Sequence, residues 1–183
     1  LRPPLKLKRT WTEPLDCTTH RPDRICPQGG FLQAVDGSED CLFLDVYMPA
    51  AAINGSTLLP AYVFIYGGGF TQGDSYFGGL YDATNLVVAS GHIHVAMNYR
   101  LGALGFLALD ALLAESNTTG NYGTLDQVMA LQWVQTNAAH LSLDKSRVTV
   151  AGGAAGALRV RWGPGGARAR GPLPRPRVGS ARP

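Results

Sequence analysis

Hydrophobic and polar residues alternate in residues 41–48 with a period of two. Leu42, Leu44, Val46 and Met48 fall on one face, which is the pattern of a half-buried β-strand. Residues 62–66 form an unbroken apolar run that ends in three glycines, as expected of a strand buried on both faces. Two shorter strands are predicted at residues 94–98 and 148–151.

Between the last two predicted strands, the apolar residues repeat with the period of a helix. We predict this helix over residues 125–139, with Thr124 as its N-cap, and another helix over residues 81–89. The face expected to be buried carries Leu125, Val128, Met129, Leu131, Val134 and Ala138. Strands that alternate with helices predict an α/β fold with a mixed or parallel sheet covered by helices.

Charge divides the 183-residue chain into two parts. Residues 1–157 carry 9 Lys and Arg against 13 Asp and Glu, whereas residues 158–183 carry 7 Arg and no acidic residue. Because 17 of those last 26 residues are Arg, Gly or Pro, we expect 1–157 to be the folded domain and 158–183 a disordered tail. The tail is either an Arg-rich segment that binds nucleic acid or another acidic partner or, as we favour, unrelated sequence from a splicing or frame error. Because we favour the second interpretation, we expect no nucleic-acid partner.

The three glycines after the 62–66 strand are the first candidate for chemistry. Gly67, Gly68 and Gly69 lack side chains, so their backbone N–H groups can approach an anion closely. A phosphate-binding loop is the competing interpretation, but no Gly-Lys-Ser/Thr motif follows. After a buried strand, the glycines favour an oxyanion-hole loop of the type found in esterases.

The second candidate follows the strand at 148–151. Gly152 and Gly156 flank a central Ala154, which is the spacing of the nucleophile elbow, where a serine normally occupies the centre. Residues 151–157 contain no Ser, Cys or Thr. The motif therefore predicts the sharp turn of an elbow that lacks its nucleophile.

Together with several other segments, these two loops resemble the type-B carboxylesterase family. The family includes carboxylesterases, cholinesterases and bile-salt-activated lipase, and also the non-enzymatic neuroligins and the cholinesterase-like domain of thyroglobulin. The resemblance implies an α/β-hydrolase fold, a mixed sheet with helices on both faces, and we expect it to be incomplete at both ends of this chain. The segments that carry the resemblance, in family order between Trp11 and Ala157, are residues 26–28, 38–44, 65–70, 98–106, 120–127 and 148–157.

The resemblance also assigns roles to individual residues. Gly68, Gly69 and Ala155 correspond to the three backbone donors of the oxyanion hole, and Ala154 stands at the serine position. Gly153 stands where active members usually have Glu, and we expect the triad acid and histidine to be absent. The family hydrolyses carboxylic esters through a serine acyl-enzyme, so the resemblance implies that this chain is inactive.

Two alternatives stay open beside an inactive esterase fragment. In the first, the chain is a non-catalytic recognition or adhesion protein, which would need a protein partner. In the second, it is the product of a sequence error and does not fold stably. The incomplete sheet would leave the strand near Val148 as an exposed edge, and we therefore expect a marginal, aggregation-prone fold.

The remaining expectations concern modification, location and ion pairs. The resemblance pairs Cys26 with Cys41 and leaves Cys17 free. The sequons at Asn54 and Asn117 suggest N-glycosylation and a secreted or extracellular parent protein. We expect no signal peptide within this chain, because Leu1 is followed by Arg-Pro-Pro rather than by an apolar stretch. We expect no membrane span, metal site or cofactor. Arg100 and Glu39 are expected in buried ion pairs, Asp126 near the start of its helix as a cap or ion-pair partner, and Trp11, Trp133 and Phe106 in the core.

Overall fold

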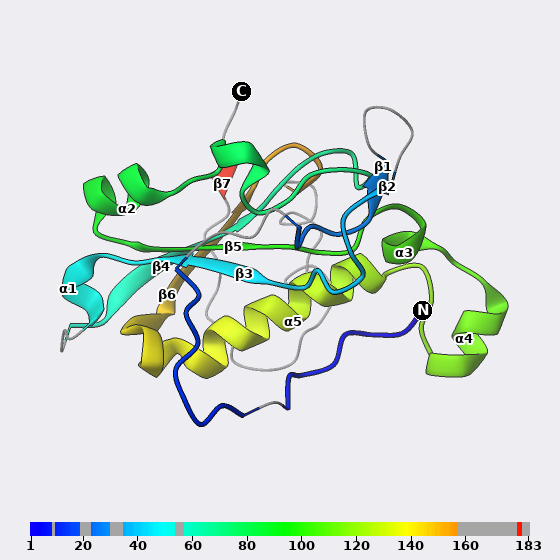
Figure 1. Cartoon of the computed structure of the whole chain (residues 1–183), viewed down its shortest axis with the longest axis horizontal. Helices are drawn as coiled ribbons and strands as arrows, with labels where there is room; N and C mark the ends of the chain where they lie inside the picture. The colour runs from blue at the N-terminus through cyan, green and yellow to red at the C-terminus, as the bar shows by residue number, and fades with distance from the viewer. Residues whose placement is uncertain (9, 19–22, 30–34, 54–56, 157–178, 181–183) are drawn as a thin grey trace.

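The computed structural model describes residues 1–8, 10–18, 23–29, 35–53, 57–156 and 179–180. Its centre is a sheet of five strands in the order β3-β5-β4-β6-β7 (Figure 1). The strands are β3 (Leu44–Tyr47), β4 (Leu59–Ile65), β5 (Ile93–Met97), β6 (Leu143–Gly152) and β7 (Gly179–Ser180). Only β3 runs antiparallel to its neighbour in this sheet, so the prediction of a mixed α/β sheet is confirmed.

Helices connect the parallel strands and lie on both sides of the sheet. Helix α2 (Thr84–Ser90) links β4 to β5 on one side, and the long α5 (Tyr122–Asn137) precedes β6 on the other (Figure 1). Parallel strands require such crossovers, because the chain must return to the same end of the sheet before the next strand begins, and a tight turn joins only antiparallel strands. The remaining elements are short: β1 (Gln28–Gly29), β2 (Val35–Asp36), α1 (Ala50–Ile53), η1 (Phe77–Gly79), α3 (Gly102–Phe106), α4 (Asp110–Ser116) and η2 (Ala138–Leu141).

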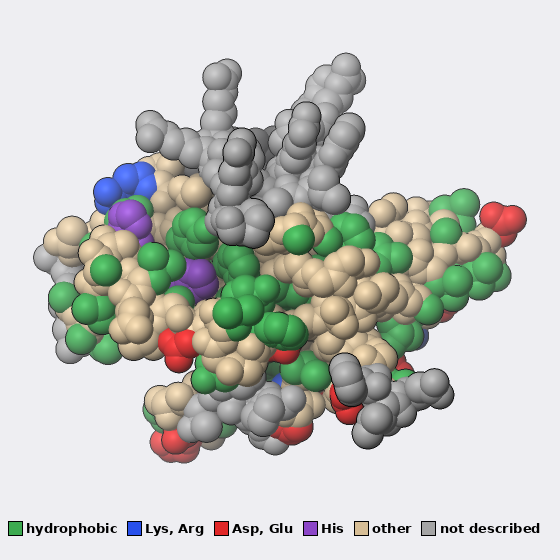
Figure 2. Space-filling view, turned by 90° about the horizontal axis from the view of Figure 1, so that it is seen from above, with side chains coloured by type: hydrophobic (Ala, Val, Ile, Leu, Met, Phe, Trp, Pro, Cys, Tyr) green, Lys and Arg blue, Asp and Glu red, His purple; other side chains and the backbone are tan. Residues whose placement is uncertain are grey.

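The main core lies between the sheet and α5. Val63 and Val95 are fully buried on the central strands and pack in one cluster with Val134 of α5. Strand β5 is buried at all five positions, as expected for the strand between β3 and β4. Seen from the side of η1 and α2, by contrast, apolar side chains remain at the surface (Figure 2). Those at least 49% exposed there are Phe77, Leu80, Leu86 and Val88.

Several sequence predictions need correction at their boundaries. The predicted strand at 148–151 is the end of the ten-residue β6, and the predicted strand at 41–48 shrinks to four residues. Helix α5 begins three residues before the predicted start, so Thr124 lies inside it and Asn121 occupies the N-cap. The helices α1, α3 and α4 were not predicted, because none is longer than seven residues and so none shows a full hydrophobic period.

The buried face of α5 also differs from the predicted one. Gly123, Asp126, Gln127 and Ala130 are buried there with Val134, whereas Leu125, Val128, Met129 and Leu131 are only partly covered. The predicted face is thus confirmed at Val134 and Ala138, and Leu131 packs against the core. In the first half of the helix, small and polar residues are buried instead, where Asp126 pairs with Arg100.

Ion pairs and tryptophans give a mixed outcome. The Arg100 guanidinium donates from Nη2 to Asp126 Oδ1 at 2.7 Å and from Nε to Oδ2 at 2.8 Å, so a buried pair exists as expected. Glu39 is exposed, which contradicts its expected burial. Trp11 and Trp133 are 46% and 39% exposed and lie outside the core, whereas Phe106 packs against it.

The end of the sheet near β6 differs from the expected free edge. Ala151 and Gly152 pair with Gly179 and Ser180 of β7, which runs parallel to β6. The edge of β6 is therefore covered at these two positions. The predicted disordered tail otherwise lies outside the described residues, as do the sequon at Asn54 and the histidine at position 20.

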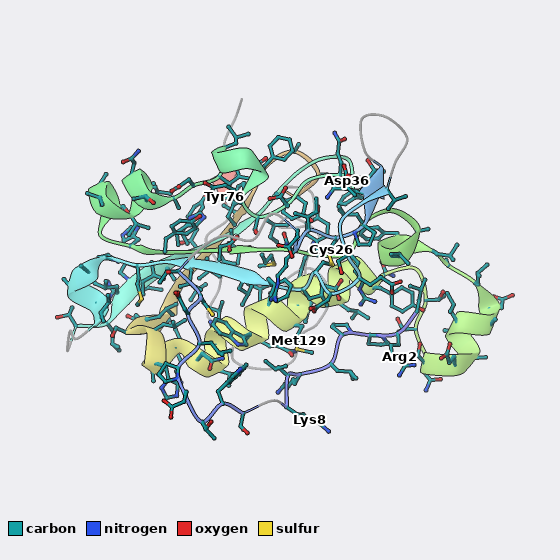
Figure 3. All side chains as sticks on the ribbon, viewed as in Figure 1. Arg2, Lys8, Cys26, Asp36, Tyr76 and Met129 are labelled. Atoms are coloured by element: carbon teal, nitrogen blue, oxygen red, sulfur yellow. A yellow bond between two sulfur atoms is a disulfide. The ribbon has the colours of Figure 1, made fainter. Side chains whose placement is uncertain are left out.

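The predicted disulfide is present. Cys26 and Cys41 are bonded and fully buried beside the β1–β2 pair, where Figure 3 shows the labelled Cys26, and Cys17 is a free, exposed thiol. The cross-link closes a loop with a sequence separation of 15 residues. By restricting the unfolded chain, a loop of this size contributes about 3 kcal/mol.

We therefore expect the double variant Cys26→Ala/Cys41→Ala to lose about 3 kcal/mol of unfolding free energy, measured by urea denaturation. The control Cys17→Ala removes an exposed thiol and should leave the midpoint unchanged. An equal shift in both proteins, or none in either, would contradict a structural role for the disulfide.

Candidate active-site turn

Two neighbouring parallel strands end at the same edge of the sheet and bring the two glycine motifs together. Strand β4 pairs in parallel with β6, and Ile65 lies opposite Gly152 at the last position of each. The Gly153 N–H donates to the Ile65 carbonyl oxygen at 3.2 Å just beyond the strands. The carboxyl ends of parallel strands are where α/β proteins place their sites.

Contacts between the two loops are made by backbone and leave no space for side chains. A Cβ added to Gly67 would lie 2.7 Å from the Gly153 carbonyl oxygen and 3.1 Å from the Ala154 Cβ. A Cβ added to Gly156 would lie 2.1 Å from the carbonyl oxygen of Ile65. The glycines at 67 and 156 are therefore required by close approach, and they hold Ala154 against the triple-glycine loop.

The triple-glycine loop turns sharply after β4. Gly68 and Gly69 have φ values of 114° and 62°, and Phe70 follows at 65°. The Gly68 carbonyl oxygen accepts from the N–H groups of Thr71 and Gln72, at 3.1 and 3.2 Å. At Gly68 a side chain is excluded twice, by the left-handed φ and by the Gln72 carbonyl oxygen, which would lie 2.0 Å from a Cβ.

The turn after β6 holds Ala154 in a left-handed conformation with φ of 44°. For a residue with a Cβ this conformation costs roughly 1–2 kcal/mol. The Ala154 methyl is exposed, whereas Ala155 behind it is buried and starts a helical segment with Gly156. A strained residue presented at a sharp strand-to-helix turn is the geometry of the nucleophile elbow.

Several backbone donors at this edge stay available. Among the described residues, the N–H groups of Gly68, Gly69 and Ala155 donate to no other residue. Ala155 is buried, whereas Gly68 is half-buried and Gly69 is exposed. These three are the groups that the resemblance assigns to the oxyanion hole, and the turn brings their two loops into contact.

A polar scaffold that the sequence analysis did not identify supports the glycine loop. Gln28 grips Gly73 on both sides: its Nε2 donates to the Gly73 carbonyl oxygen at 3.1 Å, and its Oε1 accepts from the Gly73 N–H at 2.7 Å. Next along the chain, the Ser75 N–H donates to Asn98 Oδ1 at 2.9 Å, and the Ser75 hydroxyl donates to the Asp45 carboxylate. The sequence pointed to Gln28 only as part of the segment 26–28 that carries the family resemblance. It could not predict the contact itself, because Gln28 and Gly73 are 45 residues apart in the chain.

Two tyrosines lock the base of the loop. The Tyr66 hydroxyl donates to the Tyr99 carbonyl oxygen and the Tyr99 hydroxyl donates to the Tyr66 carbonyl oxygen, both at 3.1 Å, and the rings stack at 4.5 Å. Burial, with Tyr99 beside it, raises the pKa of Tyr66 far above its usual range. Tyr66 therefore stays neutral, and the two tyrosines support the base of the loop.

No histidine of the described chain is placed by hydrogen bonding to serve as a base at this turn. His92 and His140 are exposed, and both ring nitrogens of the buried His94 lack a hydrogen-bond partner. The part of the chain that the structure describes contains no cluster of His, Cys, Asp or Glu able to hold a metal ion. Within the same residues, no helix is both long and apolar enough to cross a bilayer.

A mixed sheet whose parallel strands end in a glycine loop and a left-handed elbow defines an α/β-hydrolase, and solved esterase structures agree with it. A structure titled PNB esterase superposes with a TM-score of 0.64 and 39% sequence identity over 74% of this chain and 27% of that one. A thermophilic PNB esterase gives 0.63 and 36% over 74% of this chain and 28% of its own.

Sequence comparisons give the family. The model of the Carboxylesterase family matches residues 1–162, so the chain belongs to this family. Cocaine esterase of Oryctolagus cuniculus is 45% identical over 123 residues, 67% of this chain and 22% of that protein. Esterase B1 of Culex pipiens is 41% identical over 155 residues, 83% of this chain and 27% of its own. The chain thus spans about a quarter of the length of these relatives, and the match begins before Trp11.

The packing of the elbow against β4 can be tested with two neighbouring glycines. We expect Gly156→Ala to destabilise the chain by about 1–3 kcal/mol, because its Cβ would overlap the Ile65 carbonyl oxygen. Gly153→Ala is the matched control, since its nearest neighbour, Phe64 Cζ, lies at an ordinary 3.9 Å. Thermal and urea unfolding measure both, and equal losses would show that the turn does not pack on β4 as described.

Proposed function

We propose that this chain carries the oxyanion-hole part of a carboxylic ester hydrolase site without its nucleophile. Family membership supports ester hydrolysis as the ancestral chemistry. The N–H groups of Gly68, Gly69 and Ala155, which donate to no other described residue, support a site for an oxyanion. Such donors stabilise the negative oxygen that forms when an ester carbonyl is attacked.

The observation that carries the proposal of inactivity is Ala154 at the elbow. Its left-handed φ and exposed side chain match the conformation that would present a hydroxyl, yet a methyl group has no lone pair with which to attack a carbonyl. Catalytic triads act as a unit, so losing the nucleophile alone removes nearly all catalysis. We therefore propose that the chain does not hydrolyse esters.

A second candidate is a non-catalytic recognition protein of the same fold. The two adjacent departures, Gly153 and Ala154, favour it, because both the residue before the nucleophile and the nucleophile itself are replaced. The exposed apolar side chains on η1 and α2, including Leu80 and Val88, also support a protein-binding surface. In this case the partner would be a protein rather than an ester.

The activity proposal predicts that the purified chain hydrolyses p-nitrophenyl butyrate no faster than background. Surface lysines and histidines hydrolyse activated esters slowly, so the matched control is Gly156→Ala, in which the elbow is displaced but the surface is unchanged. Both proteins should give the same slow rate. Faster turnover by the wild-type chain that Gly156→Ala abolishes would show a working site and contradict the proposal.

We also propose a secretory history for the parent protein. The buried disulfide between Cys26 and Cys41 supports it, because disulfides persist in oxidising compartments. Asn117 supports it as well: it ends α4 in a left-handed conformation, with φ of 54°, and is exposed. A glycan there would project into solvent, and the other sequon, at Asn54, would add a second site.

When the chain is expressed behind a secretory leader in a eukaryotic cell, we expect a glycan on Asn117. Treatment with an N-glycosidase should then lower the mass of the wild-type protein by one glycan more than it lowers the mass of Asn117→Gln. Asn121→Gln, an exposed asparagine outside any sequon whose side chain makes no capping bond, is the control and should behave as wild type. Identical shifts for wild type and Asn117→Gln would refute modification at this site.

The domain boundary is part of the proposal. We place the hydrolase-related domain at residues 1–157 and an unrelated tail at 158–183, supported by the change from acidic to Arg-rich composition. The family match, which runs to residue 162, supports a boundary in this region of the chain.

A further inference from the structure

His94 lies in the middle of the sheet. It belongs to β5, between β3 and β4, and stands in one row with Tyr47 on β3 and Tyr62 on β4. The residue is 5% exposed, and Thr149 of β6 continues the row. The imidazole therefore lies on one face of the sheet, where the packing on that face shields it from water.

The surroundings of the ring are aromatic. The His94 ring stacks on Tyr62 with centroids 5.4 Å apart and meets the edge of Tyr47 at 6.0 Å. Phe64 lies at 6.1 Å and connects the cluster to Tyr81, whose ring is 4.9 Å from Phe64. These contacts supply packing, but ring faces cannot replace the hydrogen bonds that water gives an imidazolium.

Both ring nitrogens are buried without a hydrogen-bond partner among the described residues. A neutral imidazole has one N–H donor and one acceptor, so the folded state already leaves two polar atoms unpaired. An imidazolium would carry two unpaired donors and a full charge, which burial penalises far more. The sheet therefore tolerates only the neutral ring.

The titratable groups around the cluster do not compensate such a charge. Burial raises the pKa of Tyr47 to about 12 and also raises that of Tyr62, so both phenols stay neutral. Asp45 of β3 accepts the Ser75 hydroxyl, and the exposed Asp82, before α2, accepts the Thr84 N–H at 2.8 Å. Helix α2 itself has no titratable side chain, and on β6 the nearest charged side chain of this face, Arg147, is paired with Asp144.

We propose that His94 makes the folded chain acid-sensitive: protonation of its ring puts an unpaired charge between β3 and β4, and the sheet opens to hydrate it. The position acts as a built-in pH switch of the domain, independent of the elbow at the other end of the strands. An acidic compartment would thereby unfold the domain or loosen its β3 edge.

The direction follows from proton linkage. Burial lowers the pKa of His94 from its ordinary 6.5 to about 4, so between these values the unfolded chain binds a proton that the folded chain does not. Stability is therefore unaffected by this group above pH 6.5, falls as the pH drops below it, and levels off below pH 4. The folding equilibrium constant should fall on the order of 50-fold between pH 7 and pH 4.5 through this residue alone.

The test compares urea unfolding of the full chain at pH 7 and pH 4.5 for three proteins. Wild type and His92→Val should lose stability in parallel, because His92 is exposed two residues away and serves as the matched control. His94→Val places a β-branched residue, which strands favour, at this position. Its folding equilibrium constant should lack the roughly 50-fold fall between pH 7 and pH 4.5 that His94 causes in the wild type. His94→Gln, polar but unable to titrate, should behave like His94→Val and serves if the valine variant fails to fold.

A titration of the wild-type chain followed by NMR of the imidazole Cε1–H signals gives an independent readout. The His94 signal should show no protonation until the pH falls to about 4. The proposal is overturned if His94 protonates near pH 6.5 in the folded chain, if the His94 variants keep the full pH dependence, or if the wild-type chain shows no cooperative unfolding at pH 7.

Discussion

The parallel pairing of β4 with β6 is the interaction on which the rest of this structure depends. It ends at Ile65 and Gly152, and beyond that point the two loops approach so closely that there is no room for a Cβ at Gly67 or Gly156. That contact fixes where the glycine loop lies relative to the elbow. The scaffold behind the loop, with Gln28 on Gly73 and the reciprocal Tyr66–Tyr99 bonds, then prevents the loop from moving away.

The sequence predicted the parts of the structure that depend on local pattern. The strands at β4 and β5 and the helix at α5 follow from apolar periodicity, and the two glycine motifs follow from their spacing. The short helices α3 and α4 were missed because five to seven residues hold less than two turns of pattern. The buried face of α5 was predicted correctly at Val134 and Ala138 but not in the first half of the helix, where Asp126 faces inward and pairs with Arg100.

Long-range polar contacts likewise could not be predicted from the sequence. Residues 26–28 do not predict that the Gln28 side chain hydrogen-bonds the backbone of Gly73, 45 residues away. A β-strand pattern likewise does not show whether a buried histidine such as His94 has hydrogen-bond partners. A strand pattern records only that a position is buried. Whether the buried group is satisfied depends on neighbours from three other strands, which the sequence does not place.

The left-handed backbone at Ala154 has a consequence for how loss of chemistry would be detected. Both alanine and serine carry a Cβ, so the left-handed backbone at this turn strains either residue similarly, and the side chain at this position is exposed. The fold is therefore indifferent to the exchange. Melting curves, solubility and overall shape would be alike for a protein with serine at position 154 and for one with alanine there. Only an assay of ester hydrolysis would distinguish the two.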